Sequence, residues 1–313
     1  MATKIRDALA PCSLGAWPTP LEPAPALARA VGVAAVWVKR EDRTARPGGG
    51  NKVRGLEFLL AGAPPGTVFV TVGGSGSTHC LATAVHARAL GHRTALAQFP
   101  QPATDASRAV ADAARAAADL VIRAGTRIGL PRAMLRAWLG ARRRGTPRWI
   151  PGGGAHPRAV LGHLLAALEL SGQLDAPPDA IVVPLGTGGT AAGLALGIGW
   201  LGWPTRVIAV RVAPRAVANR WRTLRLARKA ADLLERQGVQ VRVPGSAFRV
   251  QVVDGLGQGY GYPTPAGERA RALAAEHGLR LDPTYGAKAF AALMQLATGN
   301  LQRAVFWHTF AWP

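Results

Sequence analysis

A lysine stands two positions after a run of glycines in the segment GGGNKVRGLEF, residues 48–58. Glycines that lead into the first turn of a helix leave backbone N–H groups free and give room for a flat or anionic ligand. Lys52 stands at that start, where the positive end of the helix and nearby apolar packing would lower the pKa of its amine. A lysine with a lowered pKa can form a Schiff base. Taken alone, a lysine after glycines is more often a solvated loop residue.

A second glycine-rich turn, GGSGSTHC at residues 73–80, joins the apolar run VFVTV to an amphipathic segment. The order strand, glycine turn, helix places ligands at the carboxyl ends of strands in α/β proteins. Ser77 or Thr78 is expected to cap the helix, which is the purely structural interpretation of both. His79 is either a general base or a residue that holds a neighbouring group, and Cys80 is interpreted as a small buried hydrophobic residue.

A third turn, PLGTGGTAAGL at residues 184–194, also lies between a strand pattern and a helix pattern. Successive N–H groups from Thr187 to Thr190, together with the helix dipole, can form a cup for a phosphate. No Gly-Lys-Ser/Thr follows, so this is no Walker loop, and the spacing differs from the dinucleotide fingerprint. The turn favours the phosphate monoester of a cofactor. The alternative is that its small residues only allow close packing of a helix on a sheet.

The chain has three tyrosines, and all of them fall in two further turns, GQGYGYP and DPTYGAK. Tyr260 and Tyr262 belong to the first turn and Tyr285 to the second. Tyrosines beside glycine turns can present phenol groups to a ligand, although stacking against a loop is the commoner explanation for one such residue.

The elements that must position these turns follow from hydrophobic periodicity. Short apolar runs rich in valine and isoleucine alternate with longer helical patterns, which is typical of α/β proteins with parallel sheets buried on both faces. The expected strands are 35–39, 67–73, 94–99, 119–123, 180–185, 206–212, 248–253 and 303–307. The expected helices are 53–61, 78–90, 104–118, 130–143, 157–170, 190–200, 215–237, 265–277 and 287–298.

Two segments rich in glycine and proline, 46–51 and 146–157, are predicted to be crossings between domains. The sequence therefore predicts a larger domain from residues 1–50 and 151–313. A smaller domain, residues 51–150, is inserted into it.

Composition limits the class of protein. With 49% hydrophobic residues among 313, the chain can fill a core, which excludes disorder for most of it. The net charge of +21 predicts at most nonspecific attraction to nucleic acid, since arginines mostly cover solvated helix faces. Two cysteines are too few for a disulfide framework, and no metal site is expected. The chain lacks an apolar run of about 18 residues and a signal peptide, so a cytoplasmic protein is expected.

Together these features resemble the tryptophan-synthase-β-like, fold type II pyridoxal-phosphate enzymes. More narrowly, the chain is similar to the branch that holds D-cysteine desulfhydrase and 1-aminocyclopropane-1-carboxylate deaminase. The motifs that carry the resemblance are PTPLEPAPAL, VKRED, GGNKVRGLEFLL, SGSTHCLATA, IPGGGAHPRAVLG, PLGTGGTAAGL, GYGYP, LDPTYGAKAF and VFWHT. They span nearly the whole chain in the right order. The resemblance implies two domains, each an open twisted, mainly parallel sheet flanked by helices, and pyridoxal 5'-phosphate as cofactor.

The resemblance also implies roles for individual residues. Lys52 would hold the cofactor as a Schiff base, and Ser77 would contact the substrate carboxylate or assist proton transfer. Tyr260 and Tyr285 would lie near the substrate amine and the reacting carbon. The residues implied at the cofactor are Lys52, Asn51, Thr78, Gly186, Thr187, Gly188, Gly189, Thr190 and Thr309. Those implied at the substrate are Ser77, Thr78 and His79.

Departures from the family pattern bear on the substrate. Thr78 stands where the family commonly has asparagine, and Gly55 stands where it has a lysine near the phosphate. Arg54 is expected to replace that cation, whereas Lys288 is expected on a solvated helix face. Gly286 directly follows Tyr285, in place of the glutamate associated with the deaminase, which argues against cyclopropane ring opening.

The expected activity is β-elimination from D-cysteine or a similar β-substituted amino acid, giving a 2-oxo acid and ammonia in a homodimeric enzyme. Deaminase-type activity, β-replacement and racemisation are alternatives with the same cofactor. From another class, the alternative is a non-catalytic relative that holds the cofactor or associates with nucleic acid.

Overall fold

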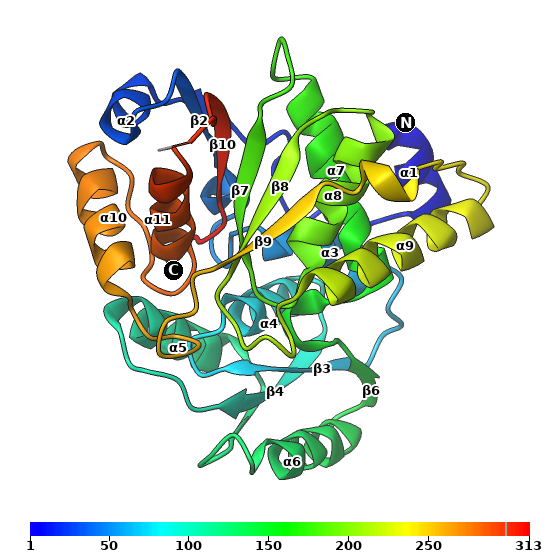
Figure 1. Cartoon of the computed structure of the whole chain (residues 1–313). Coiled ribbons are helices and arrows are strands. Elements are labelled where there is room, and N and C mark those ends of the chain that lie inside the picture. The colour runs from blue at the N-terminus through cyan, green and yellow to red at the C-terminus, as the bar shows by residue number, and fades with distance from the viewer. Residues whose placement is uncertain (298) are drawn as a thin grey trace.

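The computed structural model describes residues 1–297 and 299–313, which form two β-sheets with helices on both faces (Figure 1). The larger sheet has the order β1-β2-β10-β7-β8-β9 and the smaller one β5-β4-β3-β6. Among the described residues, all neighbouring strands are parallel except β1 and β2. This confirms the expected α/β fold with two mainly parallel sheets. Residue 298, the predicted end of the last helix, lies outside the described residues.

The strands are β1 (Leu21–Pro23), β2 (Ala35–Arg40), β3 (Thr67–Gly74), β4 (Arg93–Phe99), β5 (Leu120–Arg123), β6 (Thr146–Trp149), β7 (Ala180–Leu185), β8 (Arg206–Arg211), β9 (Val250–Asp254) and β10 (Arg303–His308). The helices are α1 (Ala2–Leu9), α2 (Pro25–Val31), α3 (Lys52–Leu60), α4 (Thr78–Ala89), α5 (Asp105–Ala117), α6 (Leu130–Arg142), α7 (Pro157–Ser171), α8 (Gly189–Trp200), α9 (Arg220–Arg236), α10 (Pro265–Glu276) and α11 (Gly286–Leu296). Short 3₁₀ turns are η1 (Glu41–Arg43), η2 (Gly152–Gly154) and η3 (Gly245–Ala247).

The central strands of the larger sheet are buried on both faces. In β10, Val305 and Trp307 pack into the cluster formed with α7, α8 and α9, while Ala304 and Phe306 pack with α2, α10 and α11. Successive side chains of a strand point to opposite faces, so this continuous apolar run covers both layers. Figure 1 shows the two groups of helices on either side of these strands.

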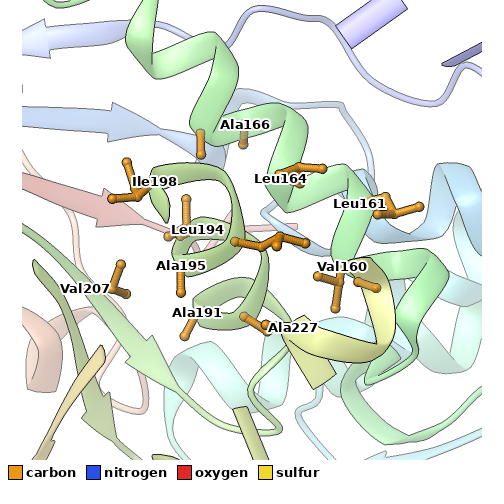
Figure 2. Close-up of a cluster of buried hydrophobic side chains, with 14 of the residues drawn as sticks. Val160, Leu161, Leu164, Ala166, Ala191, Leu194, Ala195, Ile198, Val207 and Ala227 are labelled. Carbon is orange, nitrogen blue, oxygen red and sulfur yellow. The ribbon is translucent and has the colours of Figure 1, made fainter. Parts of the chain in front are cut away.

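Helices α7 and α8 pack at very short range. A Cβ added at Gly193 of α8 would lie 2.4 Å from the Cβ of His163 in α7, so this position requires glycine. The close-up in Figure 2 shows Leu164 of α7 beside Leu194 and Ile198 of α8. Of the 12 residues of α8, all but Trp200 are buried, which explains why the helix is apolar on all sides. No described helix is both long and apolar enough to cross a membrane.

Some elements have no counterpart in the sequence prediction, namely α1, β1, α2 and β6. Strand β6 contains Pro147 and pairs only along β3, and proline within a sheet is confined to such edge strands. The glycine and proline around this strand made the sequence predict a crossing between domains here instead of a strand. Helix α2 begins at Pro25, a residue tolerated in the first turn. Helix α9 begins at Arg220 instead of residue 215, because the Asn219 side chain caps it.

We propose the domain boundaries expected from the sequence, 1–50 with 151–313 and an inserted 51–150. The proposal is supported by the smaller sheet, whose strands all lie between residues 67 and 149. Helix α3 lies where the two parts meet, since its Phe58 belongs to the core of the larger sheet and its Leu56 packs with Phe69 of the smaller one.

A buried ion network lies behind α3. The guanidinium of Arg54 donates to Glu41 from Nε at 2.7 Å and to Glu169 from Nη2 at 2.9 Å. Lys39 donates to the same Glu169 carboxylate and to the carbonyl of Thr19. Arg54 is 2% exposed and Glu41 is fully buried. The expectation that Arg54 supplies a cation near a phosphate is therefore wrong, because its guanidinium is bound by two carboxylates.

Gly55 faces α7 and not an anion. A Cβ added there would lie 3.0 Å from the Cβ of Ala159, and one added at Gly162 of α7 would lie 2.0 Å from the carbonyl oxygen of Arg54. Two backbones in such close approach leave no space for a long side chain. This position therefore lacks a lysine because α3 and α7 are in contact.

We expect Arg54→Met to destabilise the protein by about 3–5 kcal/mol, since it leaves two buried carboxylates without their shared guanidinium. Arg108→Met is the matched control. Arg108 pairs with Asp105 on the surface, with 61% of the arginine side chain exposed, and we expect a change within about 0.5 kcal/mol. Urea unfolding of both variants measures the two effects. Equal losses would contradict the assignment.

Candidate active site

A cavity of about 330 Å³ opens where the carboxyl ends of strands from both sheets meet. Its wall includes the ends of β3, β4 and β7, which is where α/β proteins bind ligands. It brings together most residues that the sequence singled out, namely Asn51, Lys52, Ser77, Thr78, His79, Gly186, Thr187, Tyr260, Tyr285 and Thr309. Gly188, Gly189 and Thr190 follow directly in the chain but are not part of this wall.

Lys52 is the first residue of α3 and lines the cavity. The loop before it is tied to the other end of the chain, because the N–H of Asn51 donates to the carbonyl of Thr309 at 3.1 Å. A Cβ at Gly50 would lie 2.9 Å from that same carbonyl oxygen. Burial lowers the pKa of Lys52 to about 8, and its amine has no ion-pair partner among the described residues. The amine is therefore still mostly protonated at neutral pH, but its neutral fraction is far larger than that of an ordinary lysine.

Ser77 caps α4, as expected for one of the two hydroxyl residues there. Its Oγ accepts a hydrogen bond from the N–H of Cys80 at 3.3 Å. A Cβ at Gly73 would lie 2.6 Å from this Oγ, so the turn needs glycine. Cys80 is fully buried, and burial raises the pKa of its thiol to about 12. The interpretation of Cys80 as a buried hydrophobic residue is consistent with this geometry.

His79 is held in one tautomer. The hydroxyl of Thr71 donates to the carbonyl of Ile150 at 2.9 Å, so it accepts from Nε2 of His79, also at 2.9 Å. Burial, and next the charge of Lys52, lower the pKa of His79 to about 3. An imidazole with this pKa is neutral and a weak base. Of the two alternatives for His79, the geometry favours a residue that holds its neighbours.

Tyr260 and Tyr285 form a pair inside the cavity. Their hydroxyl groups are hydrogen-bonded to each other, and their ring centroids lie 6.1 Å apart. Burial raises the pKa of Tyr260 to about 12 and raises that of Tyr285 well above its usual value. Both groups are therefore phenols near neutral pH, and one of them donates to the other. Tyr262, by contrast, is 42% exposed and lies outside the cavity wall.

The glycine turn at residues 186–190 begins α8. Gly188 has φ +93°, a left-handed conformation that favours glycine. The side-chain amide of Asn51 donates to Oγ1 of Thr190 at 2.7 Å, which ties the lysine loop to this turn. A Cβ at Gly186 would meet no atom within 4 Å, so the turn borders open space. The first N–H groups of a helix lack acceptors within the helix, so these residues fit a phosphate monoester.

Several residues of the cavity wall escaped sequence reasoning, and Phe99, Leu130, Val217 and Arg127 are examples. Phe99 ends β4, so its place at a carboxyl end was a usable signal. The others come from connecting segments or element starts that carry no motif.

The expectation for Lys288 is wrong. Its side chain is 2% exposed, and its amine donates to the carbonyl of Leu256 at 2.9 Å. The surrounding residues of α11 are small and apolar, so the helix lies with this face against the protein instead of water.

Comparison with known proteins agrees with this geometry. The family model described as "Pyridoxal-phosphate dependent enzyme" matches residues 12–309. The chain is 37% identical to nocardicin C-9' epimerase of Nocardia uniformis subsp. tsuyamanensis, covering 88% of this chain and 85% of that protein. It is 34% identical to a Pyrococcus horikoshii protein provisionally named 1-aminocyclopropane-1-carboxylate deaminase, covering 94% and 89%.

Solved structures show the same fold. The structure of an ACC deaminase homologue superposes with a TM-score of 0.83 at 30% identity, covering 99% of this chain and 95% of that one. Threonine deaminase isoform 2 from Solanum lycopersicum gives a TM-score of 0.68 at 21% identity, covering 99% and 84%, and supports the fold alone. With a lysine at a helix start, a phosphate cup and a family match over almost its full length, the chain belongs to the fold type II pyridoxal-phosphate-dependent enzymes.

Proposed function

We propose that the protein catalyses β-elimination from D-cysteine or a similar β-substituted amino acid, releasing a 2-oxo acid and ammonia. The observation that carries this proposal is one cavity lined both by Lys52, with its lowered pKa, and by the hydrogen-bonded phenols of Tyr260 and Tyr285. Lys52 can remove a proton, and the tyrosine pair can deliver one. Pyridoxal phosphate, when bound, supplies the electron sink that stabilises negative charge at Cα.

Each residue has a distinct part in the proposed reaction. Lys52 would hold the cofactor, and its neutral amine would take the Cα proton of the substrate. Ser77 and the start of α4 bind the substrate carboxylate through the hydroxyl and free N–H groups. As the Cβ–S bond breaks, its electron pair goes to sulfur, which takes a proton from the Tyr285 hydroxyl. Thr309, which also lines the cavity, would offer the cofactor a hydroxyl group and no carboxylate.

A second candidate is epimerisation at Cα, favoured by 37% identity to nocardicin C-9' epimerase. Lys52 would again remove the proton, and Ser77 or the tyrosine pair would return one from another side.

Deaminase-type ring opening, by contrast, has less support than β-elimination or epimerisation. The N–H of Gly286 donates to Oδ1 of Asp282, and a Cβ at Gly286 would lie 3.1 Å from that oxygen, so a glutamate there would crowd a carboxylate. β-Replacement, the homodimer and the cytoplasmic location stay predictions.

The test of the proposed function separates these reactions. The holoenzyme is incubated in D₂O with a panel of D- and L-amino acids, and 2-oxo acid, ammonia, sulfide and deuterium at Cα are measured. We expect sulfide and 2-oxo acid in equal amounts from D-cysteine. Deuterium at Cα without 2-oxo acid would indicate the epimerase instead. No turnover by protein that binds the cofactor would favour the non-catalytic relative.

We expect the cofactor-free protein to capture pyridoxal phosphate faster as the pH rises towards about 8, and to reach a plateau above it. The reason is that only the neutral amine of Lys52 attacks an aldehyde, and burial places its pKa at about 8. Borohydride reduction followed by peptide mass spectrometry measures capture. Lys52→Ala should show none. Labelling of Lys288, whose pKa burial also lowers to about 8, would show that the assignment is wrong.

We expect Tyr285→Phe to lower kcat by about 10²–10⁴-fold without preventing cofactor binding, since a general acid contributes on that order. Tyr260→Phe should lower kcat or raise KM, because its hydroxyl is the partner of Tyr285. Tyr262→Phe is the matched control and should be nearly silent, as its side chain is 42% exposed. Steady-state kinetics on the substrate found in the panel measure all three. Similar activity of all three variants would exclude a catalytic tyrosine pair.

A further inference from the structure

The turn that carries Tyr285 is organised by one buried carboxylate. Oδ2 of Asp282 accepts from the N–H groups of Thr284 at 3.0 Å and Tyr285 at 2.8 Å. Oδ1 accepts from the N–H of Gly286 at 2.8 Å. Asp282 is fully buried, and burial raises its pKa to about 6, so it is ionised at neutral pH. Three N–H groups that would otherwise lack acceptors at the start of α11 are thereby satisfied.

The turn that carries Tyr260 has little structure of its own. Three of its glycines, Gly257, Gly259 and Gly261, have φ of +62°, +153° and +89°. Such residues give the backbone many alternative conformations. The turn therefore depends on contacts from outside to place the Tyr260 ring.

Lys288 provides one such contact. It is the third residue of α11, the helix that begins directly after Tyr285. Its amine donates to the carbonyl of Leu256, the residue before the Tyr260 turn, at 2.9 Å. Burial lowers the pKa of Lys288 to about 8, while the Asp282 charge opposes this, so the amine is mostly protonated at neutral pH. Among the described residues no carboxylate lies within ion-pair distance of it. A buried ammonium that donates chiefly to a backbone carbonyl is costly for stability alone.

We propose that Asp282 and Lys288 are positioning residues that hold the two tyrosine turns where the phenols of Tyr260 and Tyr285 meet. Asp282 fixes the backbone of the turn that carries Tyr285, and so the direction of the Tyr285 ring. Lys288 ties the chain before the Tyr260 turn to α11. Neither residue belongs to the cavity wall, so both act through the tyrosines. The consequence for turnover rests on the proposed function, but the placement of the rings does not.

The test uses Lys288→Met, which keeps the apolar stem and removes the donor. Holoenzyme labelled with ¹³C in its tyrosine rings gives signals from three residues, which the three Tyr→Phe variants assign. We expect the signals of Tyr260 and Tyr285 to shift and that of Tyr262 to stay. Lys229→Met, on the exposed face of α9, is the matched control and should move none of them. Unchanged signals from the cavity tyrosines in Lys288→Met would overturn the proposal.

Kinetics give an independent reading. We expect Lys288→Met to lower kcat at least tenfold with little change in cofactor binding. In the Tyr260→Phe background the same substitution should lower kcat by less than a further twofold, since the lysine acts through that phenol. An equal loss in both backgrounds would overturn action through Tyr260. Shifted signals with unchanged kcat would support the positioning and count against the proposed role of the tyrosines.

If Lys288→Met does not fold, Asp282→Asn gives the second test. The amide keeps the size of the carboxylate but can accept from only one side, so one N–H of the turn loses its partner. We expect the Tyr285 signal to move more than the Tyr262 signal. A Tyr285 signal that does not move would overturn the role of Asp282.

Discussion

The close approach of α3 to α7 is the constraint on which the position of Lys52 depends. Gly55 and Gly162 let the two helix backbones meet, and a Cβ at Gly162 would lie 2.0 Å from the carbonyl oxygen of Arg54. Beside this contact Arg54 donates to Glu41 and Glu169, and it is not part of the cavity wall. The first residue of α3 is thereby fixed relative to the larger sheet. Packing behind the helix and chemistry at its start are parts of one arrangement.

Burial then sets the protonation states inside the cavity. In the cavity wall burial lowers the pKa of Lys52 and His79 and raises that of Tyr260, and beside the wall it raises that of Cys80. The outcome depends on the ordinary pKa of each group. The pKa of the lysine moves towards neutral pH, whereas the pKa values of the histidine and the cysteine move away from it. Lys52 is therefore the group of this set whose charge can change near neutral pH, while the phenols stay protonated and serve as hydrogen donors in the proposed reaction.

The large net charge has little to do with this site. Although the chain carries +21, the basic side chains in the cavity wall, apart from neutral His79, are Lys52 and Arg127 among the described residues. The proposed phosphate cup would rely on the N–H groups at the start of α8. Backbone groups cannot be removed by substitution and keep a fixed direction. Net charge therefore reports on the solvated surface, while the proposed anion site depends on the start of one helix.

The sequence by itself determined the fold class and most of the candidate site, because strand periodicity and glycine turns are local properties. The turns around Lys52, Ser77 and Gly188 lie where a parallel sheet presents them. Only the tertiary structure decided what each charge faces. The sequence predicted Arg54 as a cation near the phosphate and Lys288 as a surface cation, yet one binds two buried carboxylates and the other a distant carbonyl. Their partners lie far along the chain, so the energy of each charge depends on surroundings that no local pattern contains.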